Sequence, residues 1–157
     1  MDRQRLILDE GRGDFLNVDL DLKSTADLAP LLDAFGEKVM VLRADRIGLK
    51  RWLRLMLTQQ PKNPTDGILG LAKIVAGLRG RARTVWARAR KELDIGVRGG
   101  LQPASAEWLL EHHAVEAAAR SGMQIRFTVY SPRLAVGTTG PTRRKAKSNR
   151  RHLAPRD

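Results

Sequence analysis

Residues 16–22 alternate strictly between apolar and polar side chains. The apolar positions are Leu16, Val18, Leu20 and Leu22, and the polar positions are Asn17, Asp19 and Asp21. A period of two is typical of a β-strand with one buried and one polar face. The chain must therefore build a sheet that covers one side of this strand and leaves acidic residues on the other side.

The first half of the chain continues this strand with a helix and two more strands. A helix through Phe35 is expected, with Ser24, Thr25 or Asp27 as its N-cap and Gly36 at its end. Residues 39–42 read as a short buried strand. Residues 49–57 fit either a helix face or a strand. We favour a strand that forms a hairpin with residues 39–42 across residues 44–48, because prolines soon end the segment.

The second half alternates helices and strands. Thr65 or Asp66 can cap a helix, which glycines interrupt at positions 77 and 80. A basic amphipathic helix over residues 81–91 and a strand over 93–97 follow. Ser105 is expected to cap a helix through Arg120 that Gly122 stops, and residues 125–130 form the last strand.

This order predicts an α+β fold. Its first six elements match the split β-α-β arrangement of ferredoxin-like sandwiches (βαββαβ), with an added helix and strand. We expect helices on one face of a mainly antiparallel sheet. Residues 1–13 form an N-terminal segment, 14–132 a single domain and 133–157 a flexible basic tail, because the tail shows no apolar periodicity.

Composition limits the setting of the protein. The chain has no cysteine, which excludes disulfides, thiolate zinc sites and thiol nucleophiles and fits a reducing compartment. No apolar stretch approaches the roughly 20 residues that a membrane span needs, and none resembles a signal-peptide core. We therefore expect a soluble cytoplasmic protein without membrane contact.

Two short segments account for the whole net charge of +12. Residues 79–91 contribute +6, from Arg79, Arg81, Arg83, Arg88, Arg90 and Lys91. Residues 141–157 also contribute +6, from Arg143, Arg144, Lys145, Lys147, Arg150, Arg151 and Arg156 against Asp157. Localised positive charge steers and holds polyanions, whereas an inert solvated face and a solubilising tail are the alternatives.

The sequence Gly77-Leu78-Arg79-Gly80 lies between two predicted helices. This arrangement resembles K-homology RNA-binding domains, in which a Gly-x-x-Gly loop between two helices clamps the sugar-phosphate backbone. The resemblance covers about fifty residues, from the strand at 49–57 to the strand at 93–97. The run Ile74-Val75-Ala76 departs from the apolar lead-in of that family. A plain helix-helix turn is the alternative.

A second resemblance spans residues 14–132. It is carried by the segments Asn17-Val18-Asp19-Leu20-Asp21-Leu22, Ala82-Arg83-Thr84-Val85-Trp86, Leu93-Asp94-Ile95-Gly96-Val97 and Phe127-Thr128-Val129-Tyr130. These look like small bacterial α+β domains of unknown function. The resemblance implies a fold and a bacterial source, and it carries no activity or catalytic residue.

Three aspartates predicted on the polar sheet face could serve as a metal or acid-base site. They are Asp19, Asp21 and Asp94, and Arg126 on the last strand could neutralise them. Their charge makes the sheet a poor platform for phosphate, with only Tyr130 and Trp52 able to stack on bases. The helical pair of His112 and Glu116 offers half a metal site without a third ligand. No nucleotide-binding or hydrolase motif is present, so no cofactor is expected and catalysis is unsupported.

The sequence predicts a noncatalytic protein that binds RNA or DNA through residues 79–91, with the tail adding nonspecific affinity. One rival is a protein-partner module, of adaptor or toxin-neutralising type, that uses the acidic sheet face or the last strand. Another is a metal-dependent hydrolase built on the three aspartates.

Overall fold

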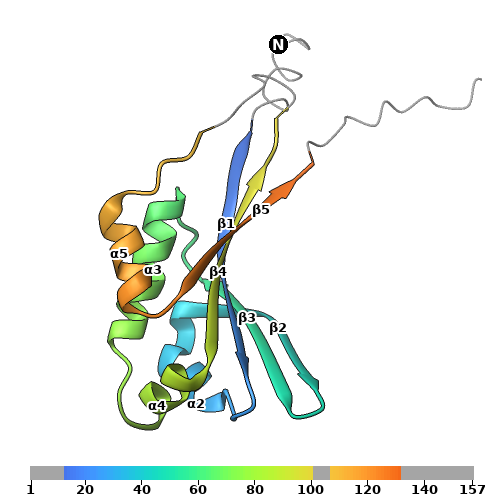
Figure 1. The fold of residues 1–157 in the computed structure, drawn as a ribbon, viewed down its shortest axis with the longest axis vertical. Coiled ribbons are helices and arrows are strands. Elements are labelled where there is room, and N and C mark those ends of the chain that lie inside the picture. Colours follow the sequence, from blue (N-terminus) through green and yellow to red (C-terminus); the bar gives the residue numbers. More distant parts are fainter. Residues whose placement is uncertain (1–12, 101–106, 132–157) are drawn as a thin grey trace, which may run out of the picture.

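The computed structural model describes residues 13–100 and 107–131. The predicted N-terminal segment before residue 13 and the predicted tail from residue 132 lie outside the described residues, as do residues 101–106. Five strands form a single sheet in the order β2-β3-β1-β4-β5, and all the helices lie on one side of it (Figure 1).

The sheet is built around the alternating strand. β1 (Asp14–Ser24) pairs antiparallel with β3 (Lys50–Leu57) on one side and with β4 (Arg90–Arg98) on the other. β2 (Val39–Ile47) adds antiparallel to β3, and β5 (Gln124–Tyr130) adds parallel to β4. The predicted α+β fold of ferredoxin-like type with an added helix and strand is confirmed.

The helical layer consists of α2 (Ala29–Phe35), α3 (Pro64–Ala76), α4 (Gly80–Arg88) and α5 (His112–Arg120), with a 3-10 turn η1 (Gly36–Lys38) after α2. Among these helices α2 packs on α4 and α3 packs on α5. No helix in the described part of the chain is long and apolar enough to cross a membrane.

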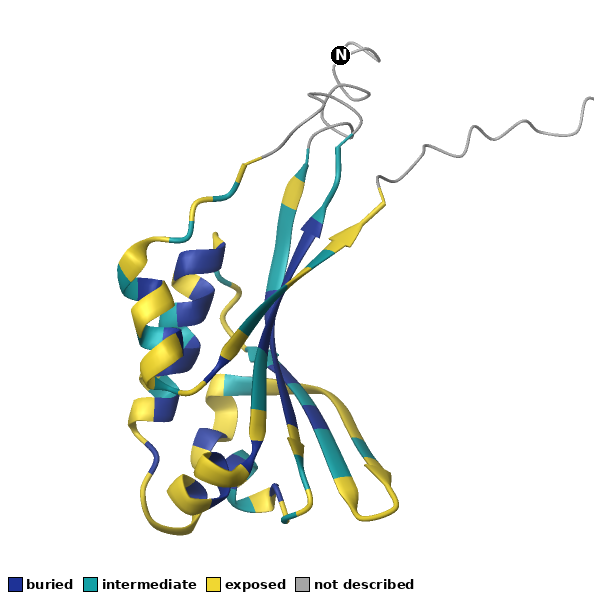
Figure 2. Cartoon of the chain, in the orientation of Figure 1, coloured by how far each residue is buried: buried dark blue, intermediate teal, exposed yellow. Residues whose placement is uncertain are grey.

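The core lies between this layer and the helix-facing side of the sheet. Figure 2 shows the buried residues gathered there, and they include Val18, Leu20 and Leu22 of β1, Leu53 and Leu55 of β3, and Leu93, Ile95 and Val97 of β4. The side chains at the intervening positions point to the other side of the sheet, which no described helix covers. We call that side the open face.

The structure corrects several predicted boundaries. The hairpin does not turn across residues 44–48. β2 continues to Ile47, and the turn is Gly48-Leu49, where Gly48 adopts a φ of 60° that glycine accepts without strain. The strand favoured for residues 49–57 is confirmed over residues 50–57 as β3, where buried Leu53 and Leu55 alternate with the partly exposed Arg54 and Met56.

Helix starts were also misplaced. Asn63, rather than Thr65 or Asp66, caps α3 by accepting the Asp66 amide. α2 has Leu28 at its N-cap, and the carboxylate of Asp27, one residue earlier, accepts a hydrogen bond of 3.3 Å from the amide of Ala29. α5 starts at His112, seven residues after Ser105, which lies outside the described residues. Gly36 and Gly122 end α2 and α5 as predicted, each with a positive φ.

Candidate nucleic-acid interface

α4 is held on the domain by an apolar side. Ala82, Val85 and Trp86 are buried at helical spacing, and the helix packs on α2 through an edge-to-face contact of the Phe35 and Trp86 rings, with centroids 6.4 Å apart. The Trp86 indole also donates a hydrogen bond of 3.0 Å to the Ser121 carbonyl. This anchor fixes the direction in which the opposite side of α4 points.

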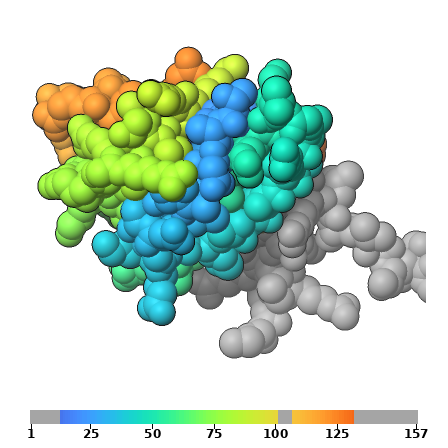
Figure 3. Space-filling view, turned by 90° about the horizontal axis from the view of Figure 1, so that it is seen from below, coloured from blue at the N-terminus to red at the C-terminus, as the bar shows by residue number. Residues whose placement is uncertain are grey.

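Three of the six predicted cations line that opposite side. Arg81, Arg83 and Arg88 are exposed, and no carboxylate in the described part of the chain lies within ion-pair distance of them. In Figure 3 the yellow-green α4 lies at the surface of the end of the molecule. The domain's own acids therefore leave this basic side uncovered.

The other three cations are engaged in the fold. Arg79 donates to the Ala76 and Leu78 carbonyls at 2.9 and 2.8 Å, where it closes the end of α3. Lys91 donates to the Trp86 carbonyl at 2.9 Å, and burial lowers its pKa. Arg90 lies 3.6 Å from Glu92. Arg90 and Lys91 also belong to β4 rather than to the helix, which ends at Arg88, so the predicted helix over 81–91 is too long.

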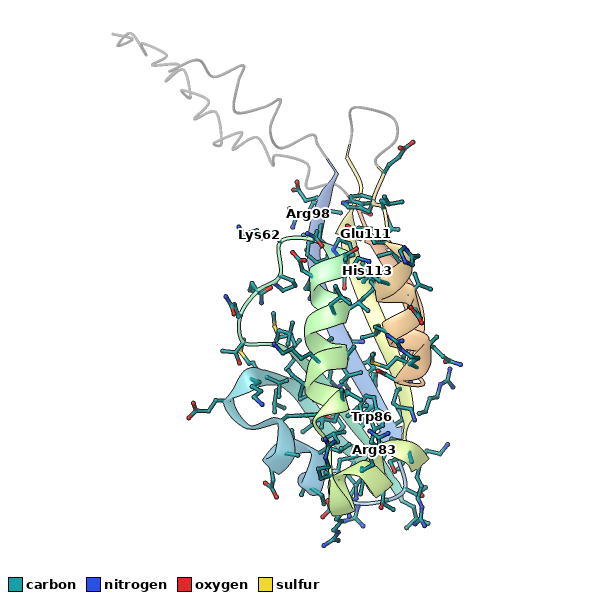
Figure 4. The ribbon with its side chains drawn as sticks, turned by 90° about the vertical axis from the view of Figure 1, so that its left-hand side faces the viewer. Lys62, Arg83, Trp86, Arg98, Glu111 and His113 are labelled. Atoms are coloured by element: carbon teal, nitrogen blue, oxygen red, sulfur yellow. The ribbon has the colours of Figure 1, made fainter. Side chains whose placement is uncertain are left out.

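A groove of about 540 Å³ adjoins α4, between it and the C-terminal halves of α3 and α5. Small apolar residues such as Ala72, Ala76 and Ala117 line it, and its lining within the described part of the chain includes no acidic residue. Its cations are Lys73, Arg83, Lys91 and Arg120. In Figure 4 Arg83 and Trp86 lie at one end of the helical layer, far from the acidic Glu111.

Sequence reasoning missed two of these cations. Lys73 and Arg120 are the basic residues in the last turns of α3 and α5. A cation in a last helical turn usually signals favourable interaction with the helix dipole, and only the packing brings both beside α4. Arg120 also pairs with Glu116 at 3.0 Å, and Lys91 is bonded to the Trp86 carbonyl, so Lys73 and Arg83 are the cations of the groove with neither kind of partner among the described residues.

The Gly-x-x-Gly segment forms the turn between α3 and α4. The amides of Gly77 and Leu78 bond to carbonyls at the end of α3, and the Leu78 side chain is buried. Gly80 has a φ of 51°, and no atom lies within 4 Å of where a β-carbon would stand. The order strand, helix, turn, helix, strand is the one that the K-homology resemblance implies. In the sheet, however, β1 separates β3 from β4.

The predicted aspartate cluster is present on the open face, but arginines cover it. Two hydrogen bonds from the Arg54 guanidinium, at 2.7 and 2.6 Å, reach the two carboxylate oxygens of Asp21. Arg126 reaches across from β5 and donates to Asp21 at 3.1 Å and to Asp94 at 2.8 Å. The predicted neutralisation by Arg126 is confirmed, whereas the equal role of Arg54 was missed because the orientation of residues 49–57 was ambiguous.

The arginines set the pKa values of the cluster. Burial raises the pKa of Asp21 and of Asp94, but hydrogen bonds and charge from Arg54 and Arg126 outweigh it, so both pKa values are lowered. Among the described residues, the cation within ion-pair distance of Asp19 is Arg54, at 3.9 Å. Burial, supported by the charges of Asp94 and Asp21, raises the pKa of Asp19 to about 6.

The geometry does not favour a metal centre in the described residues. Guanidinium groups occupy the space between the carboxylates, and residues 13–100 and 107–131 contain no group of three or more histidine, cysteine or acidic side chains placed to hold a metal ion. His113 Nδ1 lies 3.4 Å from a carboxylate oxygen of Glu111. The aspartates act as partners of arginines in the sheet.

The open face also offers little room for base stacking. Trp52 is flanked by cations, with the Lys23 ammonium 4.8 Å and the Arg43 guanidinium 4.6 Å from its ring centroid. The open face is therefore a poor platform for bases, which leaves α4 and the groove as the candidate interface. The predicted contacts of the tail, from Arg143 to Arg151, lie outside the described residues.

No protein-family model matches the chain, and neither the curated proteins nor the solved structures contain a match.

Proposed function

We propose that the protein is a noncatalytic nucleic-acid-binding protein whose interface is the outer side of α4 and the adjoining groove. The observation that carries this proposal is the exposure of Arg81, Arg83 and Arg88 without a carboxylate partner among the described residues. A guanidinium group can donate two parallel hydrogen bonds to two oxygens of one phosphate, and it stays charged at every physiological pH.

The fixed geometry of α4 supports the same function. Val85 and Trp86 anchor the helix, so its arginines are presented at set positions instead of on a mobile segment. Lys73 extends the basic surface across the groove. Cations held in place cost less conformational entropy on binding than cations that must first be ordered.

Binding of labelled RNA, single-stranded DNA and duplex DNA, measured by fluorescence anisotropy at a series of salt concentrations, tests the proposal. The variant Arg81→Ala/Arg83→Ala/Arg88→Ala should weaken binding to all sequences. It should also reduce the magnitude of the slope of log K against log salt by roughly 2–3, since each lost phosphate contact removes roughly 0.7–0.9.

The charge-matched control is Lys38→Ala/Lys50→Ala/Lys62→Ala. These lysines are exposed, and none lies on α4. In Figure 4 Lys62 is far from Arg83. We expect the control to keep most of the wild-type slope. Absence of binding at low salt, or equal losses in the two variants, would rule out α4 as the interface.

The exposed last strand favours a second candidate, a protein-partner module. Phe127, Val129 and Tyr130 of β5 are exposed large apolar residues. The open face itself is a weaker candidate than the sequence suggests, because arginines cover its acids. A stable complex that survives nuclease treatment in a pull-down would support this function over the first.

A further inference from the structure

The strand β2 leaves one side of the sheet unpaired. It ends the strand order, so within the described residues its outer backbone groups have no strand partner. Its nine residues make it longer than the mean strand of roughly 5–6 residues. Natural proteins cover or disrupt such edges, because a free edge is a template for pairing with another strand.

This edge is also apolar. Half of the exposed large hydrophobic residues that the structure describes lie in or beside β2, namely Met40, Val41, Leu42, Ile47 and Leu49. Ile47 and Leu49 are 70% and 79% exposed. In Figure 2 the β2–β3 hairpin carries a nearly continuous exposed border on the far side from the core. Exposed apolar residues gathered along one edge mark an interaction site.

The charged residues of β2 are complementary to those of a second, antiparallel copy of β2. Arg43 and Asp45 lie opposite Arg54 and Trp52 of β3, so both point to the open face, where they bond to each other within the chain. Two copies of β2 can pair antiparallel about a two-fold axis that is perpendicular to the sheet. Residues that lie opposite each other in such a pair point to the same face of the joined sheet. A register centred on Ala44 then places Arg43 of each copy opposite Asp45 of the other, so that the four side chains alternate in charge.

Neighbouring registers lack this match. A register centred on Arg43 sets two arginines opposite each other, and one centred on Asp45 sets two aspartates. Like charges directly opposite in a sheet are destabilising. The bulge between Val41 and Arg43 lies outside the central charged pairs of the Ala44 register.

We propose that β2 is a self-association edge, on which a second copy of this chain pairs antiparallel about Ala44. The result is one continuous ten-stranded sheet, since the two five-stranded sheets join at β2. The helices of both copies lie on the same side, because the two-fold axis keeps each face of the sheet on its own side. The Arg43 and Asp45 pairs fix the register, and the apolar residues of the edge supply burial.

Sedimentation velocity of the nuclease-treated full chain over a range of concentrations tests this inference. We expect a dimer for the wild type. The single variants Arg43→Asp and Asp45→Arg each turn two attractive pairs into two repulsive ones, so their self-association should weaken by roughly tenfold or more.

Mixing the two variants gives the decisive result. In a mixed pair, the Arg43→Asp chain has aspartate at both positions and the Asp45→Arg chain has arginine at both, so every opposite pair is attractive again. The expected outcome is a heterodimer of near wild-type affinity, and this rescue also shows that both variants are folded. A wild type that stays monomeric, single variants that dimerise as tightly as the wild type, or a mixture without rescue would each overturn the proposal.

Discussion

Asp21 carries its charge at 2% exposure in the centre of the sheet, and two arginines on different strands make this possible. Arg54 binds it with two parallel hydrogen bonds from β3. Arg126 reaches it from β5 and passes over Asp94 of β4. Four of the five strands therefore contribute to one ionic network, in which each guanidinium covers a carboxylate that would otherwise be buried alone.

Replacing Arg54 should destabilise the folded protein. We expect Arg54→Met to lower the free energy of unfolding by about 3 kcal/mol, because it leaves the buried Asp21 with Arg126 as its remaining cation. Urea unfolding measures the change. Arg46→Met is the control, since the one side-chain hydrogen bond of this exposed arginine within the described residues goes to the Gly48 carbonyl, and it should change stability by less than about 0.5 kcal/mol. Equal effects of the two substitutions would contradict the role of the network.

Asp19 should make the protein less stable as the pH rises. Its pKa is about 6 in the folded protein against 3.8 in the unfolded chain, so between these pH values the folded state holds a proton that the unfolded state has lost. Stability therefore falls from about pH 4 to about pH 6. The lowered pKa values of Asp21 and Asp94 act oppositely, since they remove stability as the pH falls below about 4.

Asp19→Asn should abolish the fall between pH 4 and 6, and above pH 6 it should be more stable than the wild type by roughly 1–3 kcal/mol. The asparagine keeps an oxygen that can accept the hydrogen bond from Asn17. Urea unfolding at several pH values gives the profile, with the exposed Asp33→Asn as control. A profile unchanged by Asp19→Asn would mean that Asp19 ionises normally in the folded state.

At the scale of elements, glycine determines how closely α3 lies on β1. A β-carbon at Gly67 would stand 2.6 Å from Cγ2 of Val18, a branched side chain in the core. At Gly70, one turn later, a β-carbon would meet only the end of the Leu57 side chain, at 2.7 Å. The first contact requires the helix or the strand to move, and the second requires a flexible side chain to rotate.

We expect Gly67→Ala to cost about 1–3 kcal/mol of stability through overpacking. Gly70→Ala should be close to neutral, because the gain of up to about 1 kcal/mol in helix propensity offsets the adjustment of Leu57. Thermal or urea unfolding of the two variants separates these cases. If both substitutions stabilise the protein, α3 does not lie as close to β1 as the structure has it.

Elements with a strong local pattern were predicted well. β1, α3 and β5 follow from alternation or helical spacing of apolar residues, and Gly36 and Gly122 marked the ends of α2 and α5. Element boundaries were predicted wrongly where the local sequence has no distinctive pattern. β2 is exposed along most of its length, so its residues need no alternation, and its extent is set by pairing with β3. The start of α5 likewise has no side-chain cap that a sequence would show.

At the scale of the whole molecule, charge is divided between the two sides of the sheet. On the open face, acids and arginines neutralise each other. On the helical side, α4 and the groove carry several cations. A few of them, such as Arg120, pair with an acid, and the others have no acidic partner among the described residues. A group of exposed cations without acidic partners among the described residues therefore lies at one end of the helical layer.

If α4 is the interface, a chain that ends at Gly140 should still bind nucleic acid. Without residues 141–157 it loses a net charge of +6, so binding should weaken and its salt dependence should decrease. The remaining affinity should disappear on adding Arg81→Ala/Arg83→Ala/Arg88→Ala. Anisotropy titrations of both chains test this. Loss of all binding in the shortened chain alone would assign the activity to the tail.

The sequence by itself determined the alternating strand, the order of most elements, the ferredoxin-like class and the segments that hold the net charge, because each depends on neighbours along the chain. Only the tertiary structure decided which charged side chains bond to other groups of the protein and which do not. It placed Arg54 and Arg126 over three aspartates, engaged Arg79 and Lys91 with backbone carbonyls, and brought Lys73 beside Arg83. The reason is physical: the state of a charged side chain depends on burial and on partners far away in the sequence, and packing alone sets both.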